Sequence, residues 1–130
     1  MTSMQAAVLY VGLFCLLMLV LKANVGRVRT RQKIGFGDGG NEPLQRALRV
    51  QGNAVEDVPV VLLGLIGLGA LAAPVLLIHG LGAGFLIGRV LHAIGLGGST
   101  GSSFGRSVGT LVTAVVLVVT AGACIWFAVV

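Results

Sequence analysis

Four long apolar stretches separated by short polar segments dominate the hydropathy pattern of the chain. They cover approximately residues 4–25, 44–73, 75–96 and 106–130. The second stretch begins with a polar segment that is also predicted to be helical. A helix needs roughly 20 apolar residues to cross a bilayer. We therefore predict one domain, residues 1–130, that is an all-α integral membrane protein built as a bundle of four transmembrane helices.

The distribution of cations predicts the topology of this bundle. No cation precedes the first stretch, whereas Lys22, Arg27, Arg29, Arg31 and Lys33 follow it. Cytoplasmic loops carry an excess of Lys and Arg, and a secretory signal peptide has the opposite charge order. We expect a retained first helix, both termini outside, and cytoplasmic connections at residues 26–43 and 97–105.

Composition excludes several classes of protein. The chain is 56% hydrophobic and 10% charged, with a mean hydropathy of +1.02, which is too apolar for a soluble domain of 130 residues. Its net charge of +5 comes largely from the cations after the first stretch, so we expect a topology signal and no nucleic-acid partner. The two cysteines and two histidines have no zinc-site spacing, so we expect no metal.

The third stretch contains glycines at four-residue spacing. Gly80, Gly84 and Gly88 would share one side of a helix. Small residues in such a stripe let membrane helices approach closely. We predict a helix-packing groove along all three.

Polar residues gather on one side of the second predicted helix. At about 100° per residue, the five polar residues fall within an arc of about 100°. They are Arg46, Arg49, Asn53, Glu56 and Asp57. Charged groups inside a membrane are costly, so we expect this side to face the protein or an aqueous cleft, with the charges paired to one another. The pattern fits a structural ion-pair network or a ligand site.

Further cations lie near the same membrane end on the other helices. Arg89 and His92 are three residues apart on one face of the third helix, and Arg106 begins the fourth. With Arg46 and Arg49 they leave a surplus of positive charge, which favours an anionic ligand or lipid headgroups.

Three sequence segments resemble a known family. RVQGNAVE at 49–56, followed by Pro59, resembles the R-A-x-x-N-x-x-E-x-x-P signature of MAPEG proteins, the membrane-associated proteins in eicosanoid and glutathione metabolism. GFGDGG at 35–40 is similar to the glycine-and-aspartate turn of bacterial members, and RVLHA at 89–93 resembles their R-x-x-H-A stretch. No P-loop, zinc-protease or serine-hydrolase motif is present.

The resemblance implies a homotrimer of four-helix subunits, in a bacterial inner membrane, with glutathione sites between subunits near the cytoplasmic face. It implies that Arg49 holds a carboxylate of the tripeptide, that Glu56 holds its amine, and that Arg106 is the catalytic cation at its thiolate. The other residues that we expect to bind substrate are Asn53, Arg89, His92, Gln51 and Arg29.

The implied activity is that of a glutathione transferase or peroxidase, with glutathione or another small thiol as co-substrate. The thiolate would attack a lipophilic electrophile from the membrane lipid, or reduce a lipid hydroperoxide. Gln51, Asp57 and Leu96 stand where members often have histidine, tyrosine and tyrosine. The alternative is therefore a non-catalytic protein of the same fold with a structural ion-pair network. A small drug exporter would need an acid in the first helix, which has none.

Overall fold

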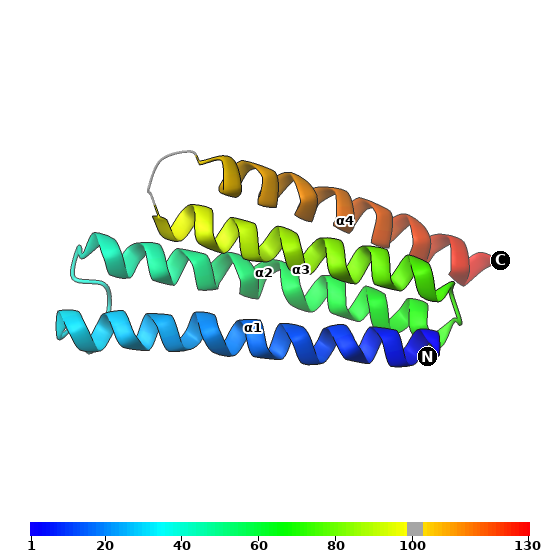
Figure 1. Cartoon of the computed structure of the whole chain (residues 1–130), viewed down its shortest axis with the longest axis horizontal. Helices are drawn as coiled ribbons and strands as arrows, with labels where there is room; N and C mark the ends of the chain where they lie inside the picture. Colours follow the sequence, from blue (N-terminus) through cyan, green and yellow to red (C-terminus); the bar gives the residue numbers. More distant parts are fainter. Residues whose placement is uncertain (99–102) are drawn as a thin grey trace.

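The chain folds into four long helices. The computed structural model describes residues 1–98 and 103–130, and these contain α1 (Ser3–Gln32), α2 (Glu42–Ala70), α3 (Val75–Gly98) and α4 (Phe104–Val129), with no strand among them (Figure 1). All four helices are long and apolar enough to cross a membrane. The predicted all-α bundle of four membrane-spanning helices is confirmed.

The first connection is shorter than the sequence suggested. Helix α1 continues past the expected end near residue 25 to Gln32, because the polar residues after it are compatible with a helix. It ends at Lys33, whose backbone is left-handed (φ 55°) and whose N–H donates to the carbonyls of Arg29 and Thr30. The second predicted connection, 97–105, lies partly outside the described residues.

Polar side chains cap the helix starts. Thr2 forms a capping box with Gln5 at the start of α1. The Asn41 side chain accepts from the Leu44 N–H at 3.0 Å, and the Ser103 hydroxyl accepts from the Arg106 N–H at 3.3 Å. Each cap satisfies a backbone donor that a helix start leaves without a partner. The Ser103 cap also fixes where Arg106 enters the bundle.

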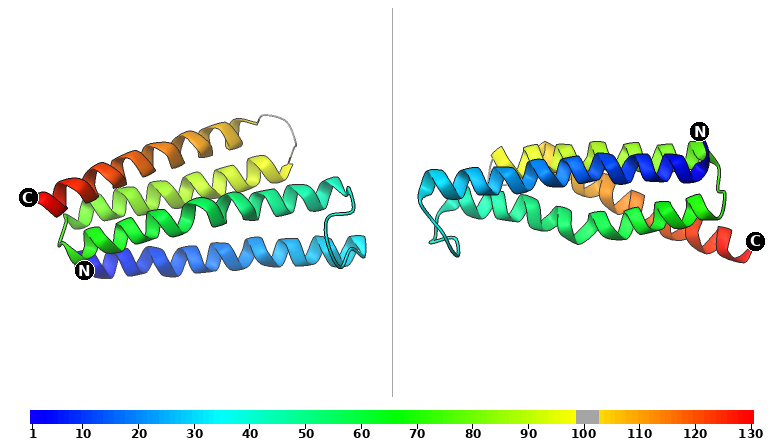
Figure 2. Two further views of the ribbon diagram at one scale, coloured as in Figure 1. Left: turned by 180° about the vertical axis from the view of Figure 1, so that it is seen from behind. Right: turned by 90° about the horizontal axis from the view of Figure 1, so that it is seen from below.

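The helices run up and down with two ends of different character. The α1–α2 and α3–α4 connections lie at one end, whereas the α2–α3 connection and both termini lie at the other (Figures 1 and 2). The most extensive contacts are between α3 and α4 and between α1 and α2. We call the end with the two connections the polar end, because the cations between Arg27 and Lys33 lie there.

Helices α1 and α3 are in close contact near the other end. The Tyr10 hydroxyl lies 3.0 Å from His79 Nδ1 and donates to the His79 carbonyl at 3.2 Å. One turn further, the Phe14 and Phe85 rings pack with their centroids 4.9 Å apart. Gly82 lies against the Tyr10 ring, where there is no room for a side chain.

The predicted glycine groove is only partly correct. Nothing approaches the positions that Cβ atoms would take at Gly80 and Gly84, whereas Gly88 packs against Val112. The close approach of α3 and α4 depends on a different set. Gly88 meets α4 at Gly109 and Val112, and Gly95 meets the start of α4 at Gly105 and Arg106. Spacing alone places glycines on one side of a helix, but it does not say which side meets a neighbour.

Gly82→Ala is expected to lower the free energy of unfolding by about 1–3 kcal/mol, because its methyl group would overlap the Tyr10 ring in a packed position. Thermal unfolding in detergent micelles measures the change. Gly80→Ala is the matched control, two residues away on the same helix with open space at the Cβ position. It should be neutral or stabilising, since alanine favours helix. Equal losses in both variants would contradict this packing.

Candidate functional site

A buried ion pair joins α2 to α3. Arg89 Nη1 lies 3.0 Å from Asp57 Oδ2, with the arginine side chain 3% exposed and the aspartate side chain 29% exposed. Buried arginine is found where its charge is paired. The Nε of Arg89 has no hydrogen-bond partner within the described residues. The pair therefore fixes the guanidinium but leaves one of its donors available.

His92 and Arg106 complete a cluster around this pair. His92 lies on α3 one turn after Arg89, is buried, and has an Nδ1 atom without a hydrogen-bond partner in the described part of the chain. The backbone of Arg106 lies against Gly95 of α3, about one turn after His92. Gly109 allows α4 to lie directly against His92. We call Asp57, Arg89, His92 and Arg106 the Arg89 cluster.

A second group of polar residues lies on the opposite edge of α2. Arg49 and Glu56 are exposed, and neither makes an ion pair within residues 1–98 and 103–130. Asn53 is half-buried between them, and its Nδ2 donates to the Arg49 carbonyl at 2.9 Å. We call Arg49, Asn53 and Glu56 the α2 outer face. It presents one free cation and one free anion two helical turns apart.

The expected pairing of Arg46 and Arg49 with Glu56 and Asp57 is wrong for the described residues. Arg46 instead pairs with Glu42, one turn earlier, at 3.4 Å, and Asp57 pairs with Arg89 on α3. The reason is the rotation of α2. Its polar arc straddles the boundary between the packed and the exposed sides, so the adjacent carboxylates of Glu56 and Asp57 point to different surroundings.

Two predicted substrate-binding residues lie apart from both groups. Arg29 Nη1 donates to the Gly37 carbonyl at 2.8 Å, so it supports the glycine turn of the α1–α2 connection. Gln51 is half-buried and lies about 160° around α2 from Arg49. Within a single chain, neither residue can share a small ligand with the α2 outer face.

The structure thus brings together Arg89, His92 and Arg106, as the sequence suggested, and adds Asp57 to them. The individual role of Asp57 was not predicted from the sequence, where it was grouped with Glu56. The position of Asp57 around the helix could have indicated this role. Asp57 lies at one edge of the polar arc, about 20° around α2 from Val50, which is buried. A cluster with two arginines, one histidine and one carboxylate has a surplus of positive charge. It can attract and hold an anion such as a thiolate.

Comparison with known proteins identifies relatives of the chain. The MAPEG family model matches residues 7–126. The Inner membrane protein YecN of Escherichia coli strain K12 is 38% identical over 58 residues, which are 45% of this chain and 44% of the relative. The same protein from the Escherichia coli strain O6:H1 matches equally. The chain therefore spans less than half the length of these curated relatives in the matched region. No solved structure matches the chain.

Proposed function

The chain belongs to the MAPEG family, and from this membership and its charged groups we propose that it is a membrane-bound glutathione transferase or peroxidase. The single observation that carries the proposal is the exposure of Arg49 and Glu56 on a helix that crosses the membrane. Charged side chains on the exposed side of a membrane-spanning helix are stable only when groups of opposite charge bind to them. A zwitterionic peptide with both carboxylate and amine groups supplies one for each.

The depth of Glu56 strengthens this argument. Roughly 20 residues cover the hydrocarbon core, so counting back from the end of α2 at Ala70 puts the other boundary near Gln51. Glu56 then lies inside the hydrocarbon region and Arg49 at its edge. A charged side chain at the centre of the bilayer costs about 2.5–3.5 kcal/mol on insertion scales, and somewhat less toward the interface. The α2 outer face is therefore more stable against protein than against lipid.

We propose that the protein covering this face is a second copy of the chain, in a homotrimer. Each α2 outer face would then meet a neighbouring subunit and form a polar cleft at the interface. Arg49 would hold a carboxylate of glutathione, Glu56 its amine, and Asn53 a backbone amide. Gln51 and Arg29 lie away from this face within their own chain. They could therefore contribute only from the neighbouring subunit.

The reaction would take place at the Arg89 cluster. A fixed cation lowers the pKa of a nearby thiol and raises its thiolate fraction at neutral pH. Arg106 is half-buried and is not engaged in an ion pair within the described residues, so its charge is available for the sulfur. Arg89 is held by Asp57 and would act through the field of the cluster.

The proposed enzyme would catalyse one of two reactions, a conjugation or a reduction. In conjugation, the thiolate forms a sulfur–carbon bond with a lipophilic electrophile, which loses its leaving group, and the thiol proton goes to water. In reduction, two glutathione molecules give one disulfide, while a lipid hydroperoxide becomes an alcohol and water. Both substrates would enter from the lipid. We further propose that the membrane is a bacterial inner membrane, as the name of the relative YecN states for that protein, with the polar end toward the cytoplasm.

Glutathione binding by the purified protein tests the proposal. By isothermal titration, Arg49→Ala should weaken binding at least about tenfold, because a hydrogen-bonded charge pair is lost. Arg46→Ala is the matched control. It removes the same charge one turn away, from a residue that pairs with Glu42 on a different side of α2. We expect it to bind as the wild type does. No glutathione binding by the wild-type protein would reject the proposal.

The buried Arg89–Asp57 pair favours a second candidate, a non-catalytic family member in which the charges only hold helices together. This candidate predicts no conjugation of thiols with a model electrophile by the wild-type protein. It also predicts that Glu56→Gln lowers the stability of the trimer in detergent. Clear conjugation activity would reject it.

A further inference from the structure

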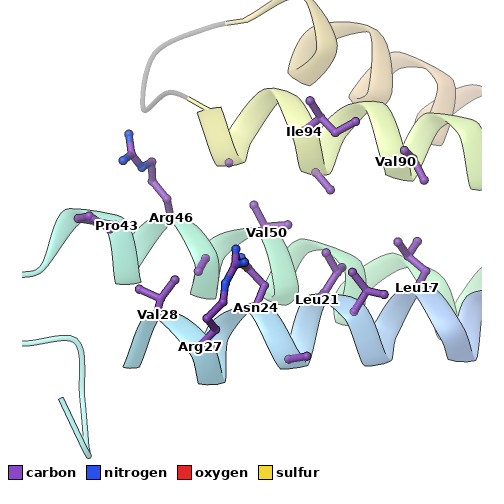
Figure 3. Close-up of a pocket in the computed structure, with 15 residues that line it drawn as sticks. Leu17, Leu21, Asn24, Arg27, Val28, Pro43, Arg46, Val50, Val90 and Ile94 are labelled. Atoms are coloured by element: carbon purple, nitrogen blue, oxygen red, sulfur yellow. The ribbon is translucent and has the colours of Figure 1, made fainter. Parts of the chain in front are cut away.

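A cavity of about 610 Å³ lies between α1, α2 and α3 near the polar end. Apolar side chains from all three helices form most of its wall, including Leu17, Leu21, Val50, Val90 and Ile94 (Figure 3). Its volume falls within the range of about 300–1,000 Å³ that is typical of small-molecule sites. The cavity is partly open to its surroundings, so a hydrocarbon chain can enter it and make dispersion contacts with its apolar wall.

The cavity arises from the way α1 and α3 diverge. Near the termini the two helices are joined through Tyr10 with His79 and Phe14 with Phe85. Leu17 is the next residue along this side of α1, and it already lines the cavity. Within the described residues no aromatic pair continues this contact toward the polar end. The cavity lies there, between α1, α2 and α3 (Figure 3). Figure 2 shows the arrangement of these helices.

Two cations from different helices line the same cavity toward the polar end. Arg27 belongs to α1 and Arg46 to α2 (Figure 3). The Arg27 Nη2 donates to Asn24 Oδ1 at 3.1 Å, and this is the one hydrogen bond of its guanidinium within residues 1–98 and 103–130. The partner of Arg46 is Glu42, whose side chain is 61% exposed. A surface pair of this kind is weak, so Arg46 can exchange it for a better-placed anion.

The depth of Arg27 matches that of lipid phosphates. From Met4, where the apolar part of α1 begins, to Arg27 the helix rises about 35 Å. The hydrocarbon core is about 30 Å thick and the headgroups extend a few ångströms beyond it. Leu17 and Leu21 therefore lie at the depth of acyl chains, and Arg27 lies among the headgroups.

We propose that this cavity binds one anionic phospholipid of the surrounding bilayer, with an acyl chain against Leu17, Leu21 and Ile94 and the phosphate between Arg27 and Arg46. The arrangement combines an apolar channel inside the membrane with two arginines at its polar mouth. Paired basic residues at the membrane surface attract anionic lipids, and arginine binds phosphate with charge-assisted hydrogen bonds.

This lipid site is separate from the proposed thiol site. None of Arg49, Asn53 and Glu56 lines the cavity. On α2, the cavity residues Arg46 and Val50 lie on the packed side, about 60–100° around the helix from Arg49. Loss of lipid binding and loss of glutathione binding can therefore be observed independently.

Native mass spectrometry of the full chain in detergent, titrated with phosphatidylglycerol or with phosphatidylcholine of the same acyl chains, tests the proposal. We expect one tightly bound phosphatidylglycerol per chain and about a tenfold preference over phosphatidylcholine. The double variant Arg27→Gln/Arg46→Gln should lose this preference. The matched control, Arg31→Gln/Lys33→Gln, removes two cations at the same end that do not line the cavity, and it should keep the preference.

A cavity-filling variant tests the apolar part of the site. Ala93 is half-buried on the α3 wall, so Ala93→Phe should reduce retention of both phospholipids at least about tenfold while glutathione binding is unchanged. Equal binding of the two lipids by the wild type, an undiminished preference in the double variant, or tighter binding of oleate than of phosphatidylglycerol would each overturn the proposal.

Discussion

Replacing Asp57 by Asn is expected to lower the free energy of unfolding by about 3–5 kcal/mol. The change removes the charge that compensates Arg89, whose side chain is only 3% exposed and cannot reach water without a rearrangement of α2 and α3. Loss of one partner of a buried pair is costlier than loss of both, because the remaining charge stays buried. Reversible unfolding in mixed detergent micelles, followed by circular dichroism, measures the effect.

Two further variants make this test specific. Asp57→Leu/Arg89→Met removes both charges and should regain most of the lost stability, since apolar residues of similar size can replace a buried pair. Glu56→Gln alters the neighbouring carboxylate, which is exposed and has no ion pair in the described part of the chain. Its effect on unfolding of the unliganded chain should stay within about 1 kcal/mol. Equal losses for Asp57→Asn and Glu56→Gln would contradict the assignment of Asp57 as the partner of Arg89.

Replacing Arg106 by Ala is expected to slow conjugation of glutathione with a chloronitrobenzene electrophile about 100-fold at pH 7. This expectation rests on the proposed function. Arg106 lies at the start of α4 against Gly95, about one turn after His92 on α3, and its side chain is half-buried. Without this cation, the bound thiol would ionise much as a free thiol does, with a pKa of about 8.5.

The pH dependence separates a role at the sulfur from general damage. A wild-type protein that stabilises the thiolate should reach its maximal rate well below pH 8.5, whereas the Arg106→Ala variant should keep gaining rate up to about that pH. The ratio of the wild-type conjugation rate to the Arg106→Ala rate should therefore decrease as the pH rises. Arg46→Ala, which also removes one arginine, is again the control, and its pH profile should match that of the wild type. A variant with parallel pH profiles and a uniformly lower rate would point to a structural effect only.

The sequence was sufficient for the architecture because lipid imposes a simple rule on it. A helix that crosses the bilayer must be long and apolar, so the number of helices and their order could be read from hydropathy. The helix ends were less certain. Polarity after residue 25 suggested a connection, yet Arg, Thr and Gln do not break a helix, and α1 continues to Gln32.

The candidate site was predictable only where helix geometry sufficed. The proximity of Arg89 to His92 follows from their spacing, and Arg106 follows from the short α3–α4 connection. The rotation of α2 did not follow, because an apolar side chain is equally suited to lipid and to a neighbouring helix. For the same reason the four-residue spacing selected Gly80 and not Gly82. Among the described residues, the Cβ position of Gly80 is open, whereas Gly82 packs against Tyr10.

The placement of the α1–α2 and α3–α4 connections at the same end affects how the chain can enter a membrane. Helices α1 and α2 form one hairpin and α3 and α4 another (Figure 1). The ionised side chains of the four helices lie between the polar end and about the middle of each helix. Residues 71–74, which join the hairpins, carry no ionised side chain. Transfer of this connection through the hydrocarbon therefore requires no dehydration of a charge, whereas transfer of the α1–α2 connection would require it for several cations. The connection that crosses the hydrocarbon most readily is consequently 71–74, which allows α2 and α3 to enter the bilayer together as one hairpin.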